Sequence, residues 1–150
     1  MITADTNVFV YNVDLDDAAK HRASVEIVDA LVAQGSPIAL QVAGEFYSAM
    51  TRGLRRPPWQ AAQAARNLLT TFPVISATRR SAERALAEAA SGRLSFWDAN
   101  LLSAAEEGGC TFILSEDMSD GLRLGALEVV HPFAGGGLSD RARALLSGGS

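Results

Sequence analysis

The sequence predicts an α/β fold in which a mostly parallel β-sheet is flanked by helices. Two observations lead to this prediction. Short apolar runs alternate along the chain with longer segments whose apolar residues recur at helical spacing, which is typical of a parallel sheet covered by helices. The chain has 150 residues, 48% hydrophobic and 20% charged. It can therefore bury one core of ordinary size and does not resemble a disordered chain.

Turn-forming residues separate the elements in the N-terminal half. An apolar run at the N-terminus ends at Asp5, and the helical segment that follows places Ile27 and Leu31 on one face. Gly35-Ser36-Pro37 ends that helix, and Gly53 ends a later one. The elements predicted there are a strand at 1–4, a helix at 16–34, a strand at 38–40, and helices at 42–52 and 59–71.

Glycines also mark the elements of the C-terminal half. Ser91-Gly92 separates two helices, and Gly108-Gly109 ends the second, as is common at a helix C-terminus. The elements predicted there are a strand at 73–75, helices at 79–90 and 96–107, and strands at 112–114 and 127–130. Runs of glycine and serine from Ala134 onward predict a loose, only partly ordered tail. We therefore expect a domain at 1–133 and a tail at 134–150.

Charge and cysteine content exclude several classes of protein. The net charge is -4, which excludes a wholly basic nucleic-acid-binding surface but not a local one, and Lys20 is the only lysine. The single cysteine, Cys110, cannot form an internal disulfide or a cysteine zinc site and is expected to be a small buried residue. The chain has no apolar stretch long enough to span a membrane and no signal peptide. We expect a cytoplasmic protein.

Acidic residues follow the predicted strands. Ligands of open parallel sheets bind at the carboxyl ends of the strands, so residues at these positions are candidates for a site. The candidates after the strands are Asp5, Asn7, Glu45, Ser115 and Asp117, with Asp120 one helical turn further along, and Asp98 is added because it lies near the start of the helix before the strand at 112–114. A set of oxygen ligands without histidine or cysteine suits magnesium or manganese better than zinc.

Several carboxylates in one cleft repel one another, and a divalent cation removes this repulsion. Such an ion can orient a water molecule, increase its acidity and stabilise the charge that develops on phosphorus. The acids are not accompanied by a dyad in which a serine, cysteine or histidine could act as the nucleophile. The candidate set therefore indicates hydrolysis of a phosphodiester by activated water.

Taken singly, each acid also has a structural explanation. Asp5 after a strand could form a turn, and Glu45 in the first turn of a helix would complement the helix dipole. Asp98 fits a helix-capping pattern with the serine three residues before it. Asp120 is more often a solvated acid than a ligand, and Glu116 is expected to point outward. Only the joint pattern favours a site.

Four segments in this order and spacing resemble the PIN domain, and most closely the VapC-type toxins of bacterial toxin–antitoxin modules. They are residues 4–8 (ADTNV), 45–46 (EF), 95–99 (SFWDA) and 114–118 (LSEDM). The stretches 109–121 and 129–133 also look like one subgroup of these toxins. The likeness covers about residues 1–133, and no single motif is specific by itself.

The resemblance implies a three-layer α/β/α sandwich and a magnesium- or manganese-dependent endoribonuclease. Carried over by position, the metal-binding acids would be Asp5, Glu45, Asp98 and Asp117, with Asn7 and Ser115 orienting them. Asp120 matches an acid that only some members carry. Family members commonly form homodimers and are inhibited by a cognate antitoxin protein. These properties are implied by the likeness and do not follow from the spacing.

Rival classes fit the residues less well. Haloacid-dehalogenase-type phosphatases need a second aspartate where this chain has Asn7, and response-regulator receivers need a lysine near the end of the sheet, whereas Lys20 lies in the first helical segment. A non-catalytic PIN-like module that binds RNA or protein remains the alternative, although it predicts a missing carboxylate. The RNA target cannot be read from the sequence.

Arginines and tryptophans are candidates for contacts with RNA. The arginines cluster at positions 52, 55 and 56 and at 79, 80 and 84. They could guide an RNA backbone, line a protein interface or simply form solvated helix faces. Trp59 and Trp97 could stack on unpaired bases, but burial or an interface is the favoured interpretation.

Overall fold

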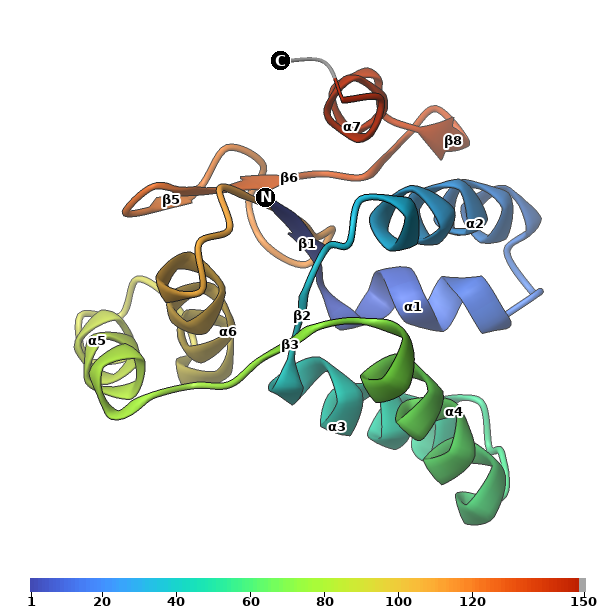
Figure 1. Ribbon diagram of the computed structural model, residues 1–150, viewed down its shortest axis with the longest axis horizontal. Coiled ribbons are helices and arrows are strands. Elements are labelled where there is room, and N and C mark those ends of the chain that lie inside the picture. Colours follow the sequence, from blue (N-terminus) through green and yellow to red (C-terminus); the bar gives the residue numbers. More distant parts are fainter. Residues whose placement is uncertain (149–150) are drawn as a thin grey trace.

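A four-stranded sheet lies at the centre of the protein in the computed structural model, of which residues 1–148 are described (Figure 1). The strand order is β1-β4-β6-β5. β1 (Ile2–Ala4), β4 (Phe112–Leu114) and β6 (Leu127–Val130) are parallel, and the short β5 (Arg123–Leu124) is antiparallel to β6. The sheet is mostly parallel, as the sequence predicts.

The parallel strands are buried because helices cover both faces of the sheet. Every residue of β1 and β6 is buried, and Ile113 and Leu114 of β4 are fully enclosed. In Figure 1, the pair α1 (Thr6–Val13) and α2 (Ala18–Ala33) lies on the opposite side of β1 from the pair α5 (Arg79–Ala90) and α6 (Phe96–Glu107). This confirms the predicted three-layer α/β/α arrangement.

Helix α1 is an element that the sequence analysis did not predict. Its sequence, TNVFVYNV, is rich in β-branched and aromatic residues, which are weak helix formers. The helix forms because Asp5 caps its N-terminus and because Val8 and Phe9 are buried. The Phe9 ring meets Phe72 edge-on, with ring centroids 5.5 Å apart. Tertiary packing therefore overrides local propensity here.

The middle of the chain forms a smaller sheet and further helices. β2 (Ile38–Ala39) and β3 (Val74–Ile75) pair in parallel as a separate two-stranded sheet. α3 (Leu40–Ser48) continues into a π-helical turn, η1 (Ala49–Gly53), where one continuous helix was predicted, and α4 (Pro58–Thr71) follows. None of the helices described here is both long enough and apolar enough to cross a membrane.

The region after residue 132 is folded, and the prediction of a loose tail from Ala134 is wrong for most of it. β7 (Phe133–Ala134) and β8 (Gly137–Leu138) form a hairpin, and α7 (Asp140–Leu146) follows. Ser139 caps α7, Ala142 is fully buried, and Arg141 pairs with Glu128 at 2.5 Å. These tertiary contacts hold a segment whose glycine content suggested flexibility. Residues 149–150, also part of the predicted tail, lie outside the described residues.

Candidate active site

Asp5 lies where β1 passes into α1, at the carboxyl end of the central strands. Its backbone N–H donates to the Leu114 carbonyl (2.9 Å) and so joins the ends of β1 and β4. Its carboxylate accepts hydrogen bonds from the Thr6 N–H (2.7 Å) and the Ser115 hydroxyl (2.8 Å). The side chain is buried, and this burial raises the pKa of Asp5 to about 6. The two hydrogen bonds oppose the rise in pKa, whereas the carboxylates of Glu45 and Asp117 add to it.

Asp117 lies beside Asp5 because both follow neighbouring strands. The Ser115 hydroxyl that donates to Asp5 also accepts from the backbone N–H of Asp117 (3.3 Å). The side-chain amide of Asn7 donates to the Asp117 carboxylate at 2.6 Å. Burial raises the pKa of Asp117, and neighbouring acids, including Asp98 and Glu45, raise it further. Asn7 and Ser115 thus contact the acids that the resemblance assigned them to orient.

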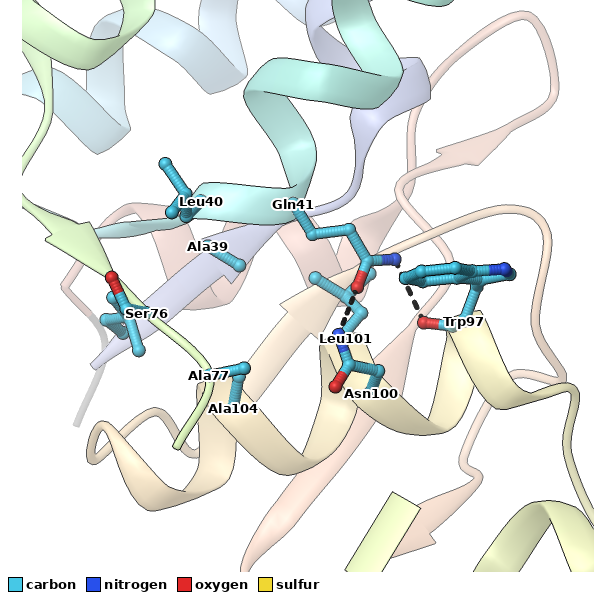
Figure 2. Close-up of a pocket in the computed structure, with 10 residues that line it drawn as sticks. Ala39, Leu40, Gln41, Ser76, Ala77, Trp97, Asn100, Leu101 and Ala104 are labelled. Carbon is cyan, nitrogen blue, oxygen red and sulfur yellow. Dashed lines mark hydrogen bonds between the residues drawn. The ribbon is translucent and has the colours of Figure 1, made fainter. Parts of the chain in front are cut away.

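Glu45 on α3 is held by two residues that the sequence analysis did not select. Thr6 donates its hydroxyl proton to one Glu45 oxygen at 2.7 Å, and the Gln41 amide donates to the other at 2.5 Å. Gln41 also donates to the Trp97 carbonyl (3.0 Å) and accepts from Asn100 (2.8 Å), so it links α3 to α6 (Figure 2). The only sequence signal was position: Gln41 lies one helical turn before Glu45 and Thr6 directly after Asp5.

Asp98 occupies the first turn of α6 and is half-buried. The Ser95 hydroxyl accepts from its backbone N–H at 3.2 Å, so Ser95 caps the helix as the pattern predicted. This cap uses the backbone of Asp98 and not its carboxylate. The carboxylate is close enough to Asp117 to raise the pKa of Asp117.

The acids at 116 and 120 have structural partners. Glu116 does not point outward as expected, because it accepts from the Tyr11 hydroxyl (2.6 Å) and pairs with Lys20 (2.8 Å). Burial alone would raise the pKa of Glu116, but the bonds from Lys20 and Tyr11 outweigh it and lower this pKa. Asp120 is exposed and accepts from the backbone N–H of His131 at 2.8 Å, which closes the loop between β4 and β6.

The predicted acids are neighbours but do not form a finished metal cage. Within residues 1–148, no group of three or more Asp, Glu, His or Cys side chains is arranged to hold a metal ion. The acids are nevertheless close enough for Glu45 and Asp117 to raise the pKa of Asp5. Magnesium keeps several of its own waters and needs few protein ligands. The donor set of carboxylate oxygens therefore fits such an ion.

Both tryptophans are exposed, so burial is wrong as an interpretation of them, whereas the interface interpretation is not tested. Trp59 on α4 is 74% exposed and Trp97 on α6 is 63% exposed. Cys110, by contrast, is buried as predicted, and its burial raises the pKa of the thiol to about 11. The exposed Trp97 lies next to Asp98 in the sequence, at the edge of the group of acids.

Comparisons with known proteins agree with this architecture. The model of the PIN domain family matches residues 2–119. The fold is similar to the crystal structure of VapC20 from Mycobacterium tuberculosis, described as a toxin that cleaves the sarcin–ricin loop. The TM-score is 0.55 at 23% sequence identity, over 75% of this chain and 87% of VapC20. No curated protein matches the sequence significantly.

Proposed function

The chain belongs to the PIN domain family, and from this premise we propose that it is a metal-dependent endoribonuclease and the toxin of a toxin–antitoxin module. One observation carries the proposal: a buried aspartate at the carboxyl end of the sheet, with its pKa raised to about 6 beside other carboxylates. Strongly perturbed acids in such a position are typical of functional sites. The fold likeness to VapC20, described as a toxin that cleaves the sarcin–ricin loop, supports the choice of RNA as substrate.

Asp5, Glu45, Asp98 and Asp117 are the residues that would hold Mg²⁺ or Mn²⁺. A bound ion of this kind supplies a Lewis acid that orients and acidifies water and stabilises charge on the phosphate. The chain contributes the positions of the carboxylates. Binding a cation would also offset the burial and the repulsion between carboxylates that together raise the pKa of Asp5 and Asp117.

Neighbouring polar groups keep three of the four carboxylates, those of Asp5, Asp117 and Glu45, in place before the substrate arrives. The Ser115 hydroxyl fixes one oxygen of Asp5, the Asn7 amide fixes one oxygen of Asp117, and Thr6 fixes one oxygen of Glu45. Such outer contacts orient metal-binding acids and limit their rotation. We assign Asp120 to loop closure and not to metal binding, because it bonds to the backbone of His131.

The test is RNA cleavage by the purified chain, free of any partner and of contaminating nuclease. Total cellular RNA is incubated with the protein and Mg²⁺ or Mn²⁺, or with a chelator. Metal-dependent fragments are expected for the native chain, and none for Asp5→Asn or Asp98→Asn. Asp29→Asn, at an exposed acid on α2, is the matched control that keeps activity. Full activity of either site variant would refute the assignment.

The proposal also includes two kinds of protein partner for this chain. A cognate antitoxin would inhibit the nuclease, and two copies of the chain would form a homodimer. Co-expression with the protein encoded beside it tests the first, and sedimentation at several concentrations tests the second. A folded sample that neither cleaves RNA nor binds metal would favour a non-catalytic PIN-like binding module. One observation favours this alternative: among residues 1–148, no three Asp, Glu, His or Cys side chains are arranged to hold a metal ion.

A further inference from the structure

The position of Trp97 is the feature that the proposed metal chemistry leaves unexplained. Its indole is 63% exposed and meets Phe96 edge-on, with ring centroids 5.0 Å apart. Its backbone carbonyl is tied to Gln41, the residue that also holds Glu45. A large aromatic ring left in solvent on a well-fixed backbone is typical of a binding surface.

Trp97 lines two cavities next to α3 and α6. One, of about 490 Å³, is lined by Trp97 together with Gln41, Gly44, Glu45 and Ser48. The other, of about 320 Å³, lies on the side of β3 and is lined by apolar residues such as Leu40 and Leu101 (Figure 2). Both share Gln41 and Trp97. The first cavity is lined by Glu45, so it borders one of the proposed metal-binding acids.

The Glu45 cavity, the one lined by these five residues, has a mainly apolar exposed surface, and Gln41, Glu45 and Ser48 are the polar side chains on it. Gly44 contributes no side chain, and a Cβ atom built there would meet nothing within 4 Å. The Gln41 amide is already engaged with Glu45, Trp97 and Asn100. A ligand there would thus gain mainly from stacking on the indole and little from hydrogen bonds to its edges.

We propose that the Glu45 cavity receives an unpaired base of the RNA, stacked on the Trp97 indole, beside the nucleotide whose phosphate reaches the acids. This inference rests on the proposed ribonuclease function. Aromatic side chains stack on splayed bases in most modes of single-stranded RNA recognition, and stacking tolerates any base because every base has a π-face. The contact supplies affinity and position, with weak discrimination between bases.

Tryptophan fluorescence tests the contact without requiring cleavage, because the chain has only two tryptophans. In an Asp5→Asn background, Trp59→Phe leaves Trp97 as the sole reporter, and Trp97→Phe leaves Trp59. The probe is short single-stranded RNA of random sequence, with a duplex of equal length as competitor. We expect single-stranded RNA to quench Trp97 but not Trp59, and the duplex to compete poorly.

Affinity measurements by fluorescence anisotropy complete the test. Trp97→Ala is expected to weaken binding of the single-stranded RNA by about 5- to 100-fold, the range found for loss of one stacked base. Gly44→Leu, which fills the cavity and leaves Trp97 unchanged, should have a similar effect. Trp97→Phe should recover part of the affinity, and Trp59→Ala should leave it unchanged.

The outcomes separate this inference from the proposed function. Metal-dependent cleavage without quenching of Trp97 would overturn the stacking proposal and leave the nuclease intact. Quenching of Trp97 by RNA without any cleavage would keep the base contact and overturn the nuclease. Unchanged RNA affinity in Trp97→Ala, together with lost binding of a protein partner, would make this surface a protein interface and refute the proposal.

Discussion

Replacing Asp5 by Asn should abolish cleavage and yet stabilise the metal-free protein at neutral pH. Burial and neighbouring carboxylates raise the pKa of Asp5 from its ordinary value of 3.8 to about 6 in the folded chain. The charged form is therefore less favourable in the folded than in the unfolded state. Because the pKa is raised, this destabilisation is absent below about pH 4 and complete above about pH 6.

The size of the effect follows from the two pKa values. Their difference, at about 1.36 kcal/mol per pH unit, gives roughly 3 kcal/mol at pH 7.5 and roughly 1 kcal/mol at pH 4.5. Asparagine keeps an oxygen for the Thr6 N–H and places an amide against the Ser115 hydroxyl. Any free-energy cost of placing the amide against Ser115 is similar at both pH values. It therefore cancels when the stability change at pH 7.5 is compared with that at pH 4.5. The stabilisation of Asp5→Asn relative to the native chain should thus be about 2 kcal/mol larger at pH 7.5.

Thermal unfolding in a chelator at both pH values measures this difference. For a chain of this length, about 2 kcal/mol corresponds to a shift in Tm of roughly 4–8 °C. The matched variant Asp29→Asn should show no such pH dependence. Saturating Mg²⁺ should raise the Tm of the native chain but not that of Asp5→Asn. A Tm difference between Asp5→Asn and the native chain that is the same at both pH values would refute the reasoning.

Two other variants probe the neighbours of the acids. Ser115→Ala removes a donor to Asp5 and an acceptor for the Asp117 N–H, so it should cost about 1–3 kcal/mol in urea unfolding. It should also move the acidic limb of the pH–activity profile to higher pH, because the Ser115 bond lowers the pKa of Asp5; an unmoved limb would contradict the role given to Ser115. Lys20→Met leaves Glu116 without its cation and should cost about 1–2 kcal/mol at neutral pH. Since the pKa of Glu116 is lowered, this loss should fade as the pH falls below about 4.5, and a loss that persists there would point to packing.

The candidate acids could be selected from sequence because parallel strands impose a simple geometry. Asp5 and Asp117 each follow a short apolar run, and the carboxyl ends of adjacent parallel strands meet at one edge of the sheet. The spacing of the runs was therefore enough to predict that both residues lie at that edge, and the structure shows that their strands are adjacent. Ser115 and Asn7 could be selected for the same reason, since they flank the two aspartates.

Other features depend on contacts that no local pattern encodes. Helix α1 forms from poor helix formers because Phe9 packs against Phe72, a residue 63 positions away in the printed sequence. Glu116 turns inward because Lys20 and Tyr11 meet it from another part of the chain. The hairpin and helix that end the described chain are held by tertiary contacts, among them the burial of Ala142 and the ion pair of Arg141 with Glu128.

The sequence alone determined the layered α/β architecture and the edge of the sheet where the acids lie, because apolar periodicity and the residues that follow each strand are local signals. Only the tertiary structure decided how the acids are held and how strongly they perturb one another. It brought Thr6 and Gln41 onto Glu45 and left Trp97 exposed beside a cavity. Desolvation and charge interaction depend on distances between segments far apart in the chain, which spacing along the sequence does not specify.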